Sequence, residues 1–357
     1  MFGFPSGPSH HMVFSKVGQE LKSRGHEIVF INTNLDGKHG NLDGFEVYTV
    51  ESGMSTEETH ALLQDMALLD PLSGWFKIFD VISRMCTAKA NDAELLKLLK
   101  GCDAVVVDPN YMCSQIMAEA AGVPVNVHLS PTNFFDPFIS IQYGVPIPLA
   151  TVPHMGTKYS PEMTFPQRLH NAVIFAIDYY IRWFIIEPKA NEFRAQLGLS
   201  GSFFKTFHNV TDVIYQTDFA FEFPRLITPS VRMVGPILPE PAVPVQDANI
   251  RDILDNAEHG VVLVSFGTIA RLEDDQAEML ANAFGKLKQK VIWKFNGNRP
   301  KVADNTLLVD WVEQNNVLGH PNVRAFVAHG GANGILEAAY HGVPLIGFPL
   351  FADQVRS

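Results

Sequence analysis

The chain has 357 residues, of which 46% are hydrophobic, and its formal net charge is −11 from 27 basic and 38 acidic residues. This length and composition can bury a sizeable core, favour two domains over one, and exclude disorder as the main state. The net negative charge argues against a partner whose affinity comes from neutralising the phosphates of a nucleic acid. A small anionic ligand can still be held by local hydrogen-bond donors.

The cysteines and the apolar segments give weaker indications. Cys86, Cys102 and Cys113 have no spacing typical of a metal site or a disulfide framework, which leaves the redox compartment undecided. No basic stretch followed by an apolar run opens the chain, so no signal peptide is predicted within it, and no uncharged run reaches membrane-spanning length. The most apolar helical stretch, 172–186, has two interpretations: a partly buried helix, or a helix whose aromatic residues touch a membrane interface.

Short β-branched runs alternate with helical patterns in the opening third, which is typical of βαβ units and a parallel sheet. Apolar residues at helical spacing predict the first helix over 12–24, with Gly25 as its left-handed cap. A contiguous apolar strand is predicted over 27–32, as expected where both faces of a sheet are covered. The pattern continues with a strand over 103–107, a helix over 113–121 and a strand over 123–129.

Domain boundaries follow from the middle of the chain. Around 131–202 the alternation gives way to a Pro- and Phe-rich loop and long helical patterns, which predicts an insertion that walls a pocket. Prolines at 236, 239, 241 and 244 are too frequent for a helix or a central strand. We therefore predict an N-terminal domain over 1–235, a linker over 236–247 and a C-terminal domain over 248–357. The second domain is predicted to have strands over 261–265, 291–295, 323–328 and 343–348, and helices over 274–288 and from Ala332.

The strongest local motif runs over 324–338, where a strand meets a glycine pair and then a helix. The unpaired N–H groups and the positive dipole end of a helix start can bind a diphosphate without a basic patch. His329 and Asn333 are placed to donate to a phosphate oxygen, and Glu337, one turn after Asn333, is placed to accept from ribose hydroxyls. A plain tight turn is the alternative for this motif taken alone.

Two further segments flank this motif. Trp311 and Gln314 precede it, and Asp353 and Gln354 follow the next predicted strand. An indole can stack on a base, an amide can bind the base or its ribose, and the Asp-Gln pair can bind sugar hydroxyls. The span 311–354 closely resembles the signature of the UDP-glycosyltransferase family, particularly the animal UDP-glucuronosyltransferases, and matches it at nearly every defining position.

The resemblance implies the GT-B fold, an α/β class in which two Rossmann-like doubly wound domains face a cleft. It implies that the N-terminal domain binds the acceptor and that the C-terminal domain binds the UDP-sugar. A loop over 264–268 also resembles the family's phosphate-contacting loop. Carried over by position, the implied donor-site residues are Trp311, Gln314 and Glu337 for uridine, His329, Gly331, Asn333 and Gly334 with Ser265, Gly267 and Thr268 for the diphosphate, and Asp353 and Gln354 for the donor sugar.

A fainter motif over 7–12 precedes the first predicted helix. A neutral imidazole at the mouth of a cleft can take a proton from an attacking hydroxyl, although a histidine near a helix start is more often a surface or capping residue. Family members have a Ser-His pair here, usually followed by an aromatic residue, so the resemblance implies His10 as the catalytic base, with His11 at the aromatic position. Asp108, at the end of a predicted strand, matches the family's orienting aspartate. Capping of the next turn is its alternative role.

The predicted function is an inverting, metal-independent transfer of a hexosyl group from a UDP-sugar to the hydroxyl of a small lipophilic acceptor. The resemblance favours UDP-glucuronate as the co-substrate, with no other cofactor. A pair of aspartates, Asp274 and Asp275, lies at a helix start and is interpreted as dipole capping rather than a metal motif. A catalytically silent form that still binds nucleotide sugar or an apolar ligand is the alternative. A nicotinamide-dependent oxidoreductase is disfavoured because no Gly-x-Gly-x-x-Gly follows the opening strands.

The resemblance also sets expectations about the whole protein. Family members usually begin with a cleaved signal peptide and continue past the Asp-Gln pair into further helices, a membrane-spanning segment and a cytosolic tail, so we expect this chain to be truncated at both ends. The full-length protein is expected in the endoplasmic reticulum membrane, facing the lumen. The sequence does not decide whether the protein forms a homo-oligomer. Asn209 begins a glycosylation acceptor pattern.

Overall fold

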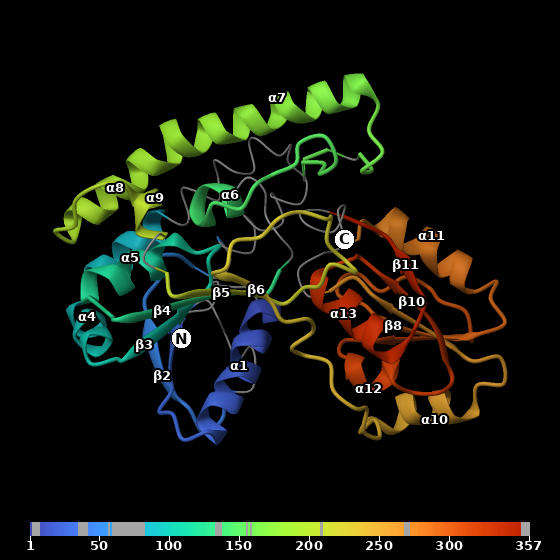
Figure 1. The fold of residues 1–357 in the computed structure, drawn as a ribbon. Helices are drawn as coiled ribbons and strands as arrows, with labels where there is room; N and C mark the ends of the chain where they lie inside the picture. The colour runs from blue at the N-terminus through green and yellow to red at the C-terminus, as the bar shows by residue number, and fades with distance from the viewer. Residues whose placement is uncertain are drawn as a thin grey trace. The chain divides into compact units, whose positions relative to one another are not determined.

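The structure is a computed structural model that describes residues 1, 8–34, 42–55, 58, 83–132, 138–154, 156–157, 159–207, 210–267 and 272–350. The chain divides into two compact units, the first from Met1 to Ile237 (unit 1) and the second beginning at Leu238 (unit 2). Each unit combines parallel strands with helices (Figure 1). The α/β class predicted from the sequence is confirmed.

Unit 1 contains a two-stranded and a four-stranded sheet, with the strand orders β1-β2 and β3-β4-β5-β6, and all their pairs are parallel. Its strands are β1 (Val29–Thr33), β2 (Glu46–Val50), β3 (Ala104–Val107), β4 (Val125–Ser130), β5 (Asp212–Tyr215) and β6 (Val231–Met233). Its helices are α1 (Pro8–Ser23), α4 (Ala93–Lys100), α5 (Met112–Ala121), α6 (Phe138–Tyr143), α7 (Phe165–Ile181), η1 (Arg182–Ile186), α8 (Glu187–Gln196) and α9 (Phe203–Thr206).

The first helix begins earlier than the sequence predicted. It starts at Pro8, and a proline fits the first helical position because its missing N–H would have no partner there. His10 therefore lies in the first turn of α1 rather than in a preceding loop. Gly25 has the positive φ of 91° that was predicted for the residue after this helix, and Gly122 ends α5 with a φ of 69°.

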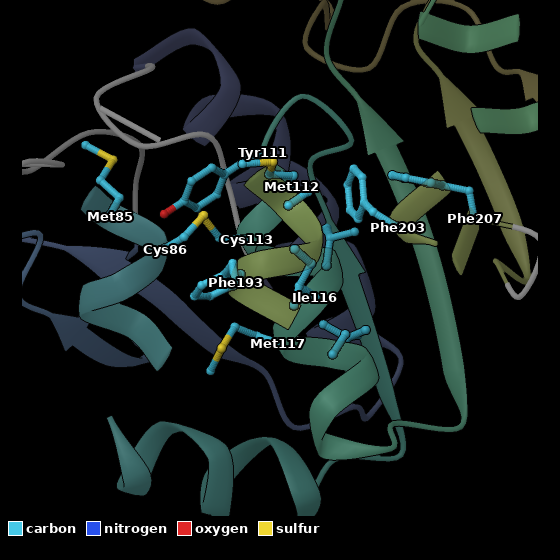
Figure 2. Close-up of a cluster of buried hydrophobic side chains, with 14 of the residues drawn as sticks. Met85, Cys86, Tyr111, Met112, Cys113, Ile116, Met117, Phe193, Phe203 and Phe207 are labelled. Atoms are coloured by element: carbon cyan, nitrogen blue, oxygen red, sulfur yellow. A yellow bond between two sulfur atoms is a disulfide. The ribbon is translucent and has the colours of Figure 1, made fainter. Parts of the chain in front are cut away.

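A disulfide lies in the core of unit 1, where the cysteine spacing had given no indication of one. Cys86 and Cys113 are joined with Cα atoms 5.1 Å apart, and both are buried among apolar side chains beside Tyr111 (Figure 2). Cys86 comes from the helical segment 83–90 and Cys113 from the first turn of α5. Sequence spacing cannot show such a pairing, because the two helical segments meet only in the folded unit.

The predicted insertion around 131–202 contains one long helical run made of α7, η1 and α8 (Figure 1). Buried Asn171 and Phe175 attach α7 to the rest of unit 1. The opposite face carries exposed large hydrophobic side chains spaced three or four residues apart. We call this set the outer stripe, and its members are Phe165, Leu169, Val173, Ile177, Tyr180, Trp183 and Phe184. In the part of the chain that the structure describes, no helix is both long and apolar enough to cross a membrane.

Unit 2 is a five-stranded parallel sheet with the order β11-β10-β7-β8-β9. In chain order this is the 3-2-1-4-5 arrangement of a doubly wound fold, in which the winding reverses between the first and fourth strands, here β7 and β10. The strands are β7 (Val261–Ser265), β8 (Lys290–Lys294), β9 (Thr306–Val309), β10 (Val323–Ala328) and β11 (Leu345–Gly347). The helices are α10 (Ala248–Asn256), α11 (Asp274–Phe284), α12 (Gln314–Leu318) and α13 (Ala332–His341).

The contiguous valines of β7 serve two separate cores. Val261 and Leu263 pack in a core with residues of α10 and α12, whereas Val262 and Val264 pack in a second core with residues of α11. Successive side chains of a strand point to opposite faces, so an uninterrupted apolar run requires cover on both sides. Figure 1 shows α11 on one side of this sheet and α10 and α12 on the other.

Candidate functional site

The predicted donor residues of unit 2 begin at the point where the winding of the sheet reverses. Strands β7 and β10 pair in parallel with Ser265 opposite Ala328, so their carboxyl ends lie side by side. Gly267 follows the first strand, and His329 and Gly331 follow the second. Ligands of doubly wound sheets bind outside the carboxyl ends of the strands at this reversal, because the two loops separate there.

The imidazole of His329 lies between two glycines. A Cβ atom on Gly267 would meet the ring at 2.9 Å, and a Cβ atom on Gly331 would meet its Nε2 atom at 2.6 Å, both too close for normal packing. Gly331 is also the N-cap residue directly before α13, and its φ of −67° is open to any residue, so only the histidine requires glycine there. Gly267 has a φ of 82°, which favours glycine by itself.

We expect Gly267→Ala to destabilise the protein more than Gly342→Ala. Gly342 has a similar φ of 68°, but nothing lies within 4 Å of the Cβ atom that alanine would add. The left-handed conformation should therefore cost each variant about 1–2 kcal/mol, and overlap with His329 should cost Gly267→Ala about 1 kcal/mol more. Urea unfolding of both variants measures the difference. Equal losses would contradict the close contact with the imidazole.

Three further predicted residues, Trp311, Gln314 and Glu337, belong to unit 2. Trp311 lies between β9 and α12 with 59% of its surface exposed, so the indole is available for stacking. Gln314 begins α12, and its Nε2 atom donates a hydrogen bond to Oε2 of Glu337 on α13. Gly334 lies close to the first of these two side chains, since a Cβ atom there would be 3.6 Å from Nε2 of Gln314. Asn333 occupies the second position of α13.

Burial controls the charges of this region. It lowers the pKa of His329 to about 4, partly opposed by a hydrogen bond with the backbone of Ser265 and reinforced by the Lys294 ammonium. His329 is therefore neutral at pH 7 and can donate one N–H. Burial raises the pKa of the Glu337 carboxyl to about 7, against the opposing effects of Gln314 and Lys294. Near neutral pH both the protonated and the ionised form of this carboxyl are therefore populated.

The sequence analysis missed Lys294, which the structure places in the middle of this group. Lys294 ends β8, and its ammonium lies 4.5 Å from the ring centroid of Trp311. A lysine at the carboxyl end of a strand with an apolar interior was the available signal, because that end faces the ligand in a doubly wound sheet.

In unit 1 the predicted base and its aspartate are in contact. Nδ1 of His10 lies 2.5 Å from Oδ2 of Asp108, which follows β3 and is completely buried. The other carboxylate oxygen accepts a hydrogen bond from the backbone N–H of Asn110 at 2.9 Å. Asp108 thus contacts the imidazole and also caps the next turn. His11, which directly follows, is buried in the fold.

Three predicted donor residues, Thr268, Asp353 and Gln354, lie outside the described residues, as does Asn209. Within the described ranges, no group of three or more His, Cys, Asp or Glu side chains is placed to hold a metal ion.

Aromatic residues cluster in the sequence of the predicted insertion, at Phe134, Phe135, Phe138 and Tyr143, and such a cluster indicates either an apolar acceptor wall or core packing. Of these, Tyr143 is buried with its hydroxyl 2.5 Å from Nδ1 of His128 and packs against Phe207. Phe134 and Phe135 lie outside the described residues. Tyr143 therefore belongs to the core of unit 1.

Known proteins resemble this chain over nearly its whole length. The family model for UDP-glucoronosyl and UDP-glucosyl transferase matches residues 1–357. A 2-hydroxyacylsphingosine 1-beta-galactosyltransferase of Rattus norvegicus is 35% identical over 360 residues, which cover 97% of this chain and 65% of that protein. UDP-glucuronosyltransferase 2A2 of Homo sapiens is 30% identical over 382 residues, which cover 98% of this chain and 69% of that protein.

Solved structures share the fold. Os79 from O. sativa in complex with U2F and trichothecene superimposes with a TM-score of 0.68 at 20% identity, over 99% of this chain and 82% of that one. The glycotransferase of kitacinnamycin superimposes with a TM-score of 0.66 at 17% identity, over 99% of this chain and 80% of that one. These likenesses confirm the GT-B fold class. The chain therefore belongs to the UDP-glucoronosyl and UDP-glucosyl transferase family.

Proposed function

We propose that this protein transfers a hexosyl group from a UDP-sugar to the hydroxyl of a small lipophilic acceptor, with inversion at the anomeric carbon. The observation that carries this proposal is the arrangement in unit 2, where His329 lies between two glycines at the strand reversal, Gln314 donates to Glu337, and the indole of Trp311 is exposed. Family membership and the UDP complex of Os79 support the choice of nucleotide.

In this proposal unit 2 is the UDP-sugar domain and unit 1 the acceptor domain, with the residues around 236–247 as the linker. Uracil stacks on Trp311, and the ribose hydroxyls bind the Gln314–Glu337 pair. The diphosphate binds the neutral His329 and the first amides of α13, which supply hydrogen-bond donors and the positive end of a helix dipole. Further diphosphate contacts come from Ser265, Gly267, Thr268, Gly331, Asn333 and Gly334, and donor-sugar contacts from Asp353 and Gln354.

Transfer is then a single displacement. His10 removes the proton of the acceptor hydroxyl as its oxygen forms a bond to the anomeric carbon, and the bond from that carbon to the diphosphate breaks on the opposite face. UDP leaves with the electron pair. Asp108 holds His10 in one tautomer and stabilises the imidazolium that forms. The donors at the start of α13 are already oriented toward the charge that develops on the diphosphate, so no metal is required in this proposal.

The named relatives limit the choice of donor sugar. They include a galactosyltransferase of 2-hydroxyacylsphingosine and several glucuronosyltransferases, so we propose galactose or glucuronate as the transferred sugar and a lipophilic alcohol as the acceptor.

A UDP-release assay tests this function. The protein is incubated with a panel of UDP-sugars that includes UDP-glucuronate, UDP-galactose and UDP-glucose, each with and without phenolic, steroidal and sphingosine-type acceptors. We expect acceptor-dependent release of UDP with one donor, and mass spectrometry of the product identifies the sugar. Binding of UDP without any release across the panel would instead support the catalytically silent alternative.

We also propose that the outer stripe of α7 and η1 rests on the interface of a lipid bilayer. Between Arg168 and Lys189, both exposed, its outward face carries no exposed charged side chain. The rings of Tyr180 and Phe184 stack at 4.8 Å beside exposed Trp183, and aromatic side chains favour the interfacial zone.

We expect the protein to co-sediment with phosphatidylcholine vesicles. Replacing Tyr180 and Phe184 with serine should weaken this binding about tenfold or more, since each ring removes apolar area from water. Met279→Ser is the matched control, because Met279 is an exposed apolar residue of α11 in unit 2. Absence of the protein from the vesicle pellet would refute this part of the proposal.

For the full-length protein we propose the lumenal face of the endoplasmic reticulum membrane. The Cys86–Cys113 disulfide supports an oxidising compartment, because such bonds rarely persist in the cytosol.

A further inference from the structure

Lys294 is held at a position where a cation is costly. Its side chain is only 9% exposed at the end of β8, and burial lowers the pKa of its ammonium, against the opposing effect of Glu337. Within the described parts of the chain, the ammonium forms no hydrogen bond or ion pair. The ammonium lies over the indole of Trp311, 4.5 Å from the ring centroid.

The backbone explains how the two side chains come together. Strands β8 and β9 pair in parallel, with Lys294 opposite Val309, two residues before Trp311. Trp311 itself belongs to no helix or strand, and more than half of its surface is exposed. Neither a backbone ladder nor close packing on all sides therefore fixes the orientation of this indole. A cation over the ring can do so, because tryptophan gives the strongest attraction to a cation among the aromatic side chains.

We propose that Lys294 is a positioning residue, which binds one face of the Trp311 indole and thereby presents the other face to the base of the bound nucleotide. This inference rests on the proposed nucleotide site. A ring has two faces, and the ammonium occupies one of them, so the base stacks on the other. Lys294 then acts on the nucleotide through the indole and makes no contact of its own with the diphosphate.

Binding measurements with uridine and UDP separate this role from a phosphate contact. Titration calorimetry is carried out on the whole chain and on Lys294→Met, Lys294→Arg, Trp311→Leu and the Lys294→Met/Trp311→Leu double variant. We expect Lys294→Met to weaken uridine and UDP by the same factor, about 3- to 30-fold. Lys294→Arg should bind nearly normally because a guanidinium also stacks on an indole. In the Trp311→Leu background, Lys294→Met should cause no further loss.

Three controls accompany these variants. Lys290→Met changes an exposed lysine at the other end of the same strand and should leave both affinities unchanged. Thermal unfolding checks that each variant is folded, and Lys294→Arg keeps the test informative if the methionine variant is not.

In turnover assays, Lys294→Met should raise the KM for the UDP-sugar while kcat changes less than twofold, as expected for a residue that acts on donor binding.

Any of three results would overturn the inference. A larger loss for UDP than for uridine would show that Lys294 contacts the diphosphate, and a further loss in the Trp311→Leu background would show that it does not act through the indole. Failure of the unmodified chain to bind UDP would overturn the proposed nucleotide site, and this inference with it.

Discussion

His10→Ala is expected to lower kcat by about 10²- to 10⁴-fold, the usual contribution of a positioned proton acceptor. The imidazole is the group that takes the proton of the acceptor hydroxyl in our proposal, and its 2.5 Å contact with buried Asp108 stabilises the charge that it gains. UDP affinity should change less than twofold, because every proposed nucleotide contact belongs to unit 2 and His10 belongs to unit 1.

Turnover and UDP binding are measured on the same preparations. His26→Ala is the matched control, since His26 is an exposed histidine just beyond the end of α1. Asp108→Asn should also lower kcat, because an amide does not stabilise an imidazolium as a carboxylate does. Near-normal turnover of His10→Ala would remove His10 from the mechanism, whereas a parallel loss of UDP binding would indicate a change of structure.

Glu337→Gln is expected to stabilise the protein at pH 8 while lowering its affinity for the nucleotide. Burial raises the pKa of this carboxyl from 4.5 to about 7. Between pH 4.5 and about pH 7 the folded state keeps a proton that the unfolded state has lost. The contribution of Glu337 to the free energy of unfolding therefore falls as pH rises through this range. Above pH 7 the penalty is complete, at about 3 kcal/mol for a shift of this size. A glutamine carries no such penalty.

Urea unfolding at pH 4.5 and pH 8 tests whether the charged carboxyl lowers stability as pH rises. The free energy of unfolding of Glu337→Gln minus that of the unmodified chain should rise by about 3 kcal/mol from pH 4.5 to pH 8. Glu278→Gln, an exposed carboxyl on α11, should show no comparable change. UDP affinity should fall about 10- to 100-fold, because an amide replaces a charged acceptor of ribose hydroxyls. A pH-independent difference in stability would contradict the raised pKa.

The parts of the fold that were predicted well are those in which local pattern and tertiary burial agree. The range predicted for β7 matches the structure because its valines are covered on both faces, and the range predicted for β10 does so for the same reason. The short strands β2 and β9 were not predicted. Their burial patterns are largely exposed or intermediate, so the sequence around them carries little of the apolar signal on which strand prediction depends.

The candidate site shows a similar division. Trp311, Gln314 and Glu337 were named from a family signature, and the structure places the last two in hydrogen-bond contact. Lys294 was not named, because its partner follows the neighbouring strand and only the pairing of β8 with β9 brings them together. The Cys86–Cys113 disulfide was missed for a related reason, since it depends on how two helical segments pack. Contacts of this kind arise from tertiary structure, and a local pattern does not show which partner each residue meets.

The close packing of Gly267 and Gly331 against His329 also limits which substitutions the protein tolerates during evolution. Any single-base change in a glycine codon that replaces glycine with another amino acid introduces a residue with a Cβ atom. At Gly267 and Gly331 that atom would lie within 3 Å of the imidazole, whereas at Gly342 it would meet nothing. Variants at the first two positions should therefore be lost from a population faster than variants at the third, even though all three residues are the same and none of them supplies a side chain to the chemistry.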